Sequence, residues 1–194
     1  MTYAFSRIRT TGHSYQSTLM ELGMNNDRAL FPAKRWGAFY GLFGMHSSEF
    51  FLVTSGDVDS IHEYLISHKD ISEVSTLLLE PTARPLDTTP LAKEGLYVFR
   101  FFDVAQQNVT EIASLSKTAW ETFEDSSLYK AQPQALFREY QPSSDNGQML
   151  LVTWYDGLES WQKSRVPHPD ATANFRQRQA LTSGTIAYAT RLII

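Results

Sequence analysis

Two histidines occupy matching places in the sequence, and each is followed two residues later by an aspartate. His68 stands in "SHKD" and His168 stands in "PHPD". An imidazole that is oriented by a carboxylate can act as a general base or a metal ligand near neutral pH. His168 with Asp170 is therefore the candidate catalytic pair, and His68 is a candidate ligand-binding residue. The alternative is that both histidines simply mark the polar ends of helices.

Charged and aromatic side chains in expected strands form a second group of candidates. Arg100, Arg138 and Arg191 lie among apolar neighbours, and a buried charge must be paired or hydrated. Such residues could line a pocket for an anionic or polar ligand group, or they could face solvent. Trp154 could pack against a planar ligand or belong to the core. The arginines of "NFRQRQ" (174–179) could clamp a carboxylate, or they could be exposed.

The remaining patterns give no sign of a metal or cofactor. The chain has no cysteine and five histidines, none of which are paired at the i, i+4 spacing of helical metal ligands. It also lacks the glycine-rich motifs of nucleotide binding and the GxSxG motif of serine hydrolases. We therefore expect no cofactor and no metal site.

Composition narrows the class of protein. The 194 residues are 42% hydrophobic, which is typical of a packed globular protein. The net charge is −4 and no basic run occurs, so nucleic acid is not an expected partner. No stretch is apolar enough for a signal peptide or a bilayer span. We expect a cytoplasmic protein with a small-molecule ligand and no membrane partner.

An internal repeat indicates which elements position these residues. "LVTSGDVDS" (52–60) resembles "LVTWYDGLES" (151–160), and "YAFSRI" (3–8) resembles "YVFRFF" (97–102). Periodicities of two predict strands, and i, i+4 spacings predict helices. The strands are expected over 3–8, 36–44, 49–55 and 74–80, and again over 97–102, 135–141, 148–154 and 185–194. Helices are expected over 15–22, 58–65, 112–123 and 158–161, with Asp57 and Asp156 as N-caps.

The β-α-β-β-α-β order of each copy is the ferredoxin-like unit. One such sheet leaves a face to be buried, so two copies predict a tandem, pseudo-twofold α+β barrel of the dimeric type. Residues 1–82 form the first predicted repeat, 83–94 a linker, and 95–194 the second repeat. An additional helix over 171–181 places Ala171, Phe175 and Arg178 on one face. The chain is expected to be a monomer with an internal pseudo-dimer, or a homodimer through exposed strand edges.

The second repeat resembles the NIPSNAP family of dimeric α+β barrel proteins. The resemblance rests on "EGLYVFRFFDV", "MLLVTWYDGLESWQKSR" and "NFRQRQAL", within residues 95–194. It implies a barrel with an internal or rim pocket and no specific reaction. The wider superfamily includes antibiotic-biosynthesis monooxygenases, haem-degrading enzymes, muconolactone isomerases and ligand-sensing modules. Haem-degrading relatives carry an axial histidine within the second helix of the unit, whereas His168 precedes the additional helix, which argues against haem.

Three functions follow from these observations. The first is binding of a small hydrophobic or planar molecule in a pocket. The second is a cofactor-independent monooxygenase or isomerase, with His168 as base and an arginine for the developing oxyanion. The third is a non-catalytic structural or assembly module. A cavity of several hundred Å³ lined by Arg or His beside aromatics would favour the first two, and a base converging with an oxyanion donor would favour the enzyme.

Overall fold

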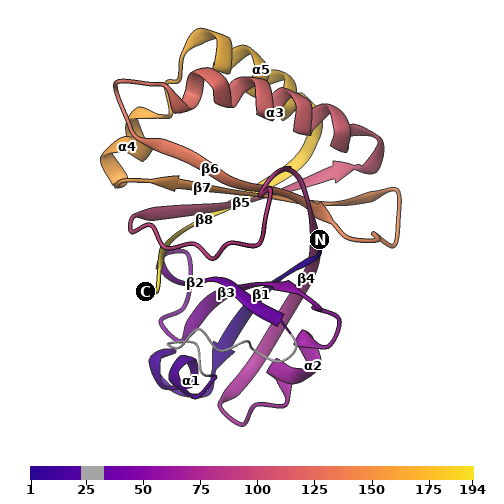
Figure 1. Cartoon of the computed structure of the whole chain (residues 1–194), viewed down its shortest axis with the longest axis vertical. Helices are drawn as coiled ribbons and strands as arrows, with labels where there is room; N and C mark the ends of the chain where they lie inside the picture. Colours follow the sequence, from indigo (N-terminus) through magenta and orange to yellow (C-terminus); the bar gives the residue numbers. More distant parts are fainter. Residues whose placement is uncertain (23–32) are drawn as a thin grey trace. The chain divides into compact units, whose positions relative to one another are not determined.

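The chain packs into two compact units, which the computed structural model describes over residues 1–22 and 33–194 (Figure 1). Unit 1 comprises Met1–Glu80, Asp87–Glu94 and Tyr188–Ile194, and unit 2 comprises Pro81–Leu86 and Gly95–Ala187. Strand β4 therefore begins in unit 1 and ends in unit 2, and β8 begins in unit 2 and ends in unit 1. The repeat boundaries at 1–82 and 95–194 stay a prediction.

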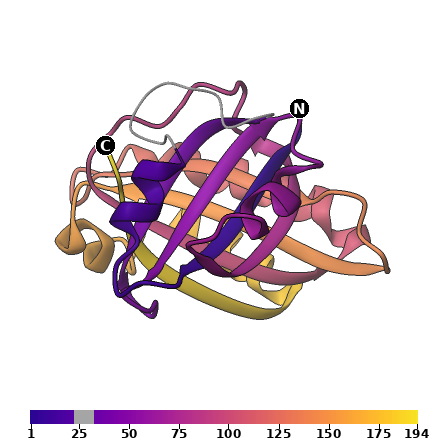
Figure 2. The ribbon, with the colours of Figure 1, turned by 90° about the horizontal axis from the view of Figure 1, so that it is seen from below.

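Unit 1 is a four-stranded antiparallel sheet with two short helices. Its elements are β1 (Tyr3–Thr10), α1 (Gln16–Glu21), β2 (Ala33–Phe43), β3 (Glu49–Gly56), α2 (Ile61–Ile66) and the first part of β4 (Ile71–Arg84). The strands lie in the order β4-β1-β3-β2, and the end of β8 pairs with β2 through Phe39 and Leu192. Both helices lie on one face of this sheet (Figure 2).

Apolar side chains occupy the space between these helices and the unit 1 sheet. Leu19 and Leu22 come from α1, Ile61 and Leu65 from α2, and all four are buried. The facing sheet residues are also apolar and buried: Ala4, Ile8, Ala38, Phe50 and Leu52. The helix side of unit 1 is thus an ordinary hydrophobic core, and the alternation of the strands produces it directly.

Unit 2 repeats this order with longer elements. It contains β5 (Leu96–Ala105), the 3₁₀ turn η1 (Gln106–Asn108), α3 (Val109–Glu124), β6 (Ala131–Glu139), β7 (Asn146–Tyr155), α4 (Leu158–Lys163), α5 (Pro169–Ala180) and the first part of β8 (Thr182–Leu192). The strand order is β8-β5-β7-β6, with the end of β4 beside β6. Helices α3 and α5 pack side by side over one face (Figure 1). Each unit is α+β and ferredoxin-like, as the spacing predicts.

The predicted strands and helices are confirmed with small shifts at their ends, but the two predicted N-caps are wrong. Helix α2 begins after Ser60 and α4 after Gly157, and neither cap side chain makes a hydrogen bond. Residues 57–60 instead form a turn that places Val58 in the core of unit 1, where it is 1% exposed. Burial of Val58 therefore delays the start of α2 beyond Asp57.

The connection between the repeats is also shorter than its prolines suggest. Strand β4 continues through Pro81 to Arg84, where the Thr82 hydroxyl donates to the Leu136 carbonyl at 2.7 Å. Residues 85–94 contain neither helix nor strand. No helix of the described residues is long and apolar enough to cross a membrane.

Candidate functional site

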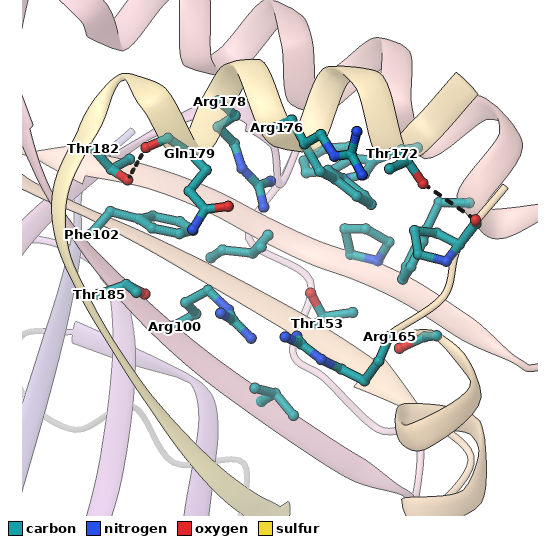
Figure 3. A pocket seen from close by; sticks show the side chains of 18 of the residues that line it. Arg100, Phe102, Thr153, Arg165, Thr172, Arg176, Arg178, Gln179, Thr182 and Thr185 are labelled. Atoms are coloured by element: carbon teal, nitrogen blue, oxygen red, sulfur yellow. Dashed lines mark hydrogen bonds between the residues drawn. The ribbon is translucent and has the colours of Figure 1, made fainter. Parts of the chain in front are cut away.

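A cavity of about 310 Å³ lies within unit 2, between the sheet and the helices that cover it (Figure 3). Its floor is formed by β5 and β7, its roof by α3 and α5, and one side by the segment that joins α4 to α5. This volume falls at the small end of the range of about 300–1,000 Å³ that is usual for ligand pockets. The cavity is therefore large enough for a small organic ligand.

Strand alternation decides which side chains reach the cavity. Val98, Arg100 and Phe102 of β5 point to the same face, as do Leu151, Thr153 and Tyr155 of β7. The two strands pair in register, with Arg100 opposite Leu151. From above, α5 presents residues at helical spacing: Thr172, Phe175, Arg176 and Gln179.

Three arginines from separate elements point into this cavity. Arg100 comes from β5, Arg178 from α5, and Arg165 from the segment that follows α4 (Figure 3). The Arg178 guanidinium lies between two rings, 5.2 Å from the centroid of Phe102 and 4.9 Å from that of Phe175. These distances are those of cation–π contacts, which hold the guanidinium in place and leave its charge uncompensated.

These three arginines, of which Arg165 is exposed and the other two are partly buried, differ from Arg7 and Arg84 because no carboxylate accompanies them. The described residues that line the cavity include no Asp or Glu. Arg178 donates to the Ser116 hydroxyl at 3.3 Å, a neutral partner. By contrast, Arg7 lies 2.7 Å from the buried Glu49 carboxylate, and Arg84 donates to Glu124 at 3.0 Å. A cluster of cations without an acid is the arrangement expected where a ligand supplies the negative charge.

The electrostatics of the cavity reflect this excess of positive charge. Burial lowers the pKa of Arg178 to about 10, and the charge of Arg100 adds to the effect. The pKa of Arg100 is lowered by burial and then by Arg165. Burial raises the pKa of Tyr155, although a hydrogen bond with Ser164 and the three arginines oppose that rise. The Tyr155 hydroxyl is therefore a hydrogen-bond donor near neutral pH and not a base.

Much of the remaining lining of the cavity is apolar and aromatic. Trp120 and Phe123 come from α3, Phe175 from α5 and Pro133 from β6. Phe123 and Phe175 meet edge to face with ring centroids 5.7 Å apart. These rings suit a planar apolar body.

A partly buried ion pair between Arg84 and Glu124 supports this aromatic wall. The Arg84 guanidinium lies 5.0 Å above the Trp120 ring, donates to Glu124 and also donates to the Pro133 carbonyl at 2.7 Å. Trp120 and Pro133 both line the cavity. Arg84 therefore positions the wall without entering the cavity.

Of the candidates predicted from sequence, Arg100 lies in the cavity and the others lie elsewhere. Trp154 is 6% exposed, but the alternation of β7 turns it to the face opposite Thr153 and Tyr155. Arg138 and Arg191 are exposed strand residues outside the lining.

The two histidines make the same local contact in both units. The Nδ1 atom of each accepts a hydrogen bond at 3.3 Å from the backbone N–H of the aspartate two residues on, which is Asp70 or Asp170. His168 is exposed, forms the N-cap of α5 and lies outside the cavity lining. Its catalytic pairing with Asp170 stays a prediction, and the cavity does not depend on it.

His68 lies in unit 1 near the end of α1. Its Nε2 atom is 3.7 Å from a Glu21 carboxylate oxygen, and Asp70 is close enough to complete a group of three metal-type ligands. The ammonium of Lys69 lies 3.7 Å from Glu21 and 3.9 Å from Asp70, so a protein cation already accompanies these carboxylates. The absence of a metal site stays a prediction.

Sequence reasoning missed Arg165 and Tyr155. The placement of Phe175 and Arg178 on one helix face with Ala171 is confirmed, since Ala171 is buried and the other two reach the cavity. Tyr155 could have been found from the alternation that places it with Thr153. Arg165 lies in an irregular segment, where no periodicity indicates the direction of a side chain.

Comparison with known proteins identifies the fold of this chain but not its family. No family model matches the sequence, and no curated protein matches it. Among solved structures, an anthrone oxidase-like protein aligns with a TM-score of 0.66 at 12% identity, covering 100% of this chain and 91% of its own. A Lactobacillus acidophilus protein, provisionally named a monooxygenase, aligns at 0.62 with 10% identity over 99% and 93%. A Listeria monocytogenes ferredoxin-fold protein related to antibiotic biosynthesis monooxygenases aligns at 0.52 with 10% identity over 100% and 95%.

These structures confirm the ferredoxin-like α+β fold. At such low identity they show the fold alone, because this fold carries many unrelated activities. The NIPSNAP resemblance is not tested by them and stays a prediction.

Proposed function

We propose that the unit 2 cavity binds a small organic anion with a planar, apolar body. The observation that supports this most strongly is the convergence of Arg100, Arg165 and Arg178 on a cavity whose described lining includes no carboxylate. The aromatic wall supplies contacts for the apolar body, and the arginines supply donors for the anionic group. This interpretation agrees with the first function inferred from sequence, and it adds the sign of the ligand's charge.

Isothermal titration calorimetry can test the proposal with two probes of similar shape. Benzoate carries the negative charge and benzamide lacks it. We expect benzoate to bind more tightly than benzamide to the wild-type protein, and Arg100→Met to remove most of the difference. Lys117→Met is the matched control, because Lys117 is an exposed residue of α3 outside the cavity. Equal binding of both probes would contradict the proposal.

A cofactor-independent oxygenase is the second candidate, and one observation favours it. The guanidinium groups and the Tyr155 hydroxyl would stabilise an enolate or phenolate oxygen within the cavity. The described lining residues include no histidine or carboxylate that could act as a base. The reaction would therefore be restricted to substrates that enter already ionised.

The oxygenase candidate has a direct assay. Anthrone is weakly acidic, and its oxidation by one O₂ gives anthraquinone and one water. Formation of anthraquinone would be followed by absorbance together with oxygen uptake, for the wild type and for Arg100→Met. A wild-type rate equal to that of buffer would leave the cavity as a binding site alone.

The tandem duplication also stays a prediction. It is supported by the same element order in both units and by the matching contacts of His68 and His168. The helix side of unit 1 carries Ala4, Ser6 and Ile8 on β1, where unit 2 carries Val98, Arg100 and Phe102 on β5. At the position of Arg100, the matching strand of unit 1 therefore carries the uncharged Ser6.

A further inference from the structure

The number of arginines that line the cavity indicates that the ligand carries more than one negative charge. This inference rests on the proposed function and concerns the class of anion. Arg100, Arg165 and Arg178 contribute three positive charges, and Arg176 adds a fourth at the cavity wall; Arg165 and Arg176 are exposed, and Arg100 and Arg178 are partly buried. A monoanion would neutralise one guanidinium and leave the others facing one another.

The arginines are close enough to repel one another. The charge of Arg100 lowers the pKa of Arg178, and the charge of Arg165 lowers that of Arg100. All three side chains point into the cavity (Figure 3), and the charges of all three oppose the rise in the pKa of Tyr155. Their repulsion is removed most fully by a ligand that places two negative charges between them.

The three arginines also offer more hydrogen-bond donors to the cavity than one carboxylate can use. A guanidinium has five N–H donors. Arg178 gives one of its donors to Ser116, while no described residue supplies a carboxylate to any of the three arginines. Thr153, Tyr155 and Ser164 carry hydroxyls and line the same cavity. A phosphate has three terminal oxygens, and two adjacent carboxylates have four, so either would engage several guanidinium groups at once.

We propose that the ligand of unit 2 is an aryl dianion, either an aryl phosphate monoester or an aromatic ortho-dicarboxylate. Its two charges lie between Arg100, Arg165 and Arg178, beside the Tyr155 hydroxyl. Its ring lies toward Trp120, Phe123 and Phe175. The two ligand chemistries share a pair of negative charges at one end of a flat apolar body, and the binding experiment distinguishes them.

The experiment compares five ring compounds by calorimetry at about pH 8 and low salt. Phenyl phosphate and phthalate are dianions there, since the second pKa of a phosphate ester is about 6. Benzenesulfonate and benzoate are monoanions of similar shape, and benzamide is the neutral reference. We expect at least one dianion to bind at least tenfold more tightly than its monoanionic partner. Phenyl phosphate as the tighter dianion would identify the phosphate ester, and phthalate would identify the dicarboxylate.

Variants separate a specific dianion site from general attraction. We expect Arg165→Met to reduce the advantage of the dianion to threefold or less while benzoate still binds. Arg100→Lys keeps the charge but removes the planar fork, so we expect an intermediate loss. Lys117→Met should change neither value. Circular dichroism and thermal unfolding of each variant would show that it is folded.

Two results would overturn the inference in different ways. If dianions and monoanions bind equally and both bind more tightly than benzamide, the dianion class is wrong and the organic-anion site stands. If no anion binds more tightly than benzamide, the proposed function fails as well.

Discussion

Replacing Arg178 by methionine should stabilise the folded protein while weakening anion binding. Arg178 is charged in both the folded and the unfolded chain at neutral pH, but folding lowers its pKa from its ordinary value to about 10. A base with a lowered pKa destabilises the fold at every pH below its folded pKa, and that cost is relieved only as the pH rises from about 10 toward the pKa of the unfolded chain. Removal of the charge therefore removes a cost that is present at pH 7.

The size of the effect follows from opposing terms. A tenfold change in an acid constant corresponds to about 1.4 kcal/mol, so the lowered pKa gives an upper bound of about 3 kcal/mol. Methionine forfeits the cation–π contacts with Phe102 and Phe175, at about 0.5–1 kcal/mol each. It also forfeits the hydrogen bond to Ser116, at about 1 kcal/mol. The net gain in the free energy of unfolding is about 0.5 kcal/mol.

Thermal and urea unfolding would measure this gain, which corresponds to a rise in Tm of about 1–2 °C for a chain of this length. Arg176→Met is the matched control, because Arg176 lies on the same helix and is exposed. We expect this control to change the free energy of unfolding by less than about 0.5 kcal/mol. Calorimetry with benzoate should show that the stabilised Arg178→Met variant binds weakly. A loss of more than about 1 kcal/mol in Arg178→Met would show that Arg178 is structural and would refute this reasoning.

Three further predictions concern pH, backbone geometry and His168. Affinity for benzoate should fall as the pH rises from about 9 to 11, because Arg178 then loses its proton in the free protein; constant affinity by calorimetry would contradict this. Gly95→Ala should lower the free energy of unfolding in urea by more than about 2 kcal/mol, because Gly95 has a φ of +146° and the new Cβ would collide with Trp154. Gly157→Ala is the control: its Cβ would meet open space, so it should have little effect. His168→Ala should lower the free energy of unfolding by about 0.5–1 kcal/mol, because the N-cap of α5 is lost, and should leave benzoate binding unchanged. A large loss of benzoate binding would show that His168 contributes to the binding site.

The order of strands and helices could be predicted from the sequence because each element carries a clear period. Strands β5 and β7 alternate apolar side chains, and α3 presents Ile112, Ala119 and Phe123 at helical spacing. The start of α2 and the N-caps of α2 and α4 could not, because a cap depends on the local turn. At Asp57 the burial of Val58 decides that turn.

The candidate site could be predicted only in part. Arg100 and the face of α5 that carries Phe175 and Arg178 follow from strand and helix periods. The same alternation assigns Trp154 to the opposite face from Tyr155, so its aromatic character was misleading as a sign of ligand binding. Arg165 depends on the path of an irregular segment, which no local pattern encodes.

A crystal structure of the protein grown with phenyl phosphate would test the central claim most directly. The claim predicts the phosphate within hydrogen-bond distance of Arg100 and Arg178, with the phenyl ring against Trp120 or Phe175. Phthalate soaked into the same crystals should occupy the same position. An empty cavity at a ligand concentration that saturates binding in solution, or a ligand bound outside unit 2, would contradict it.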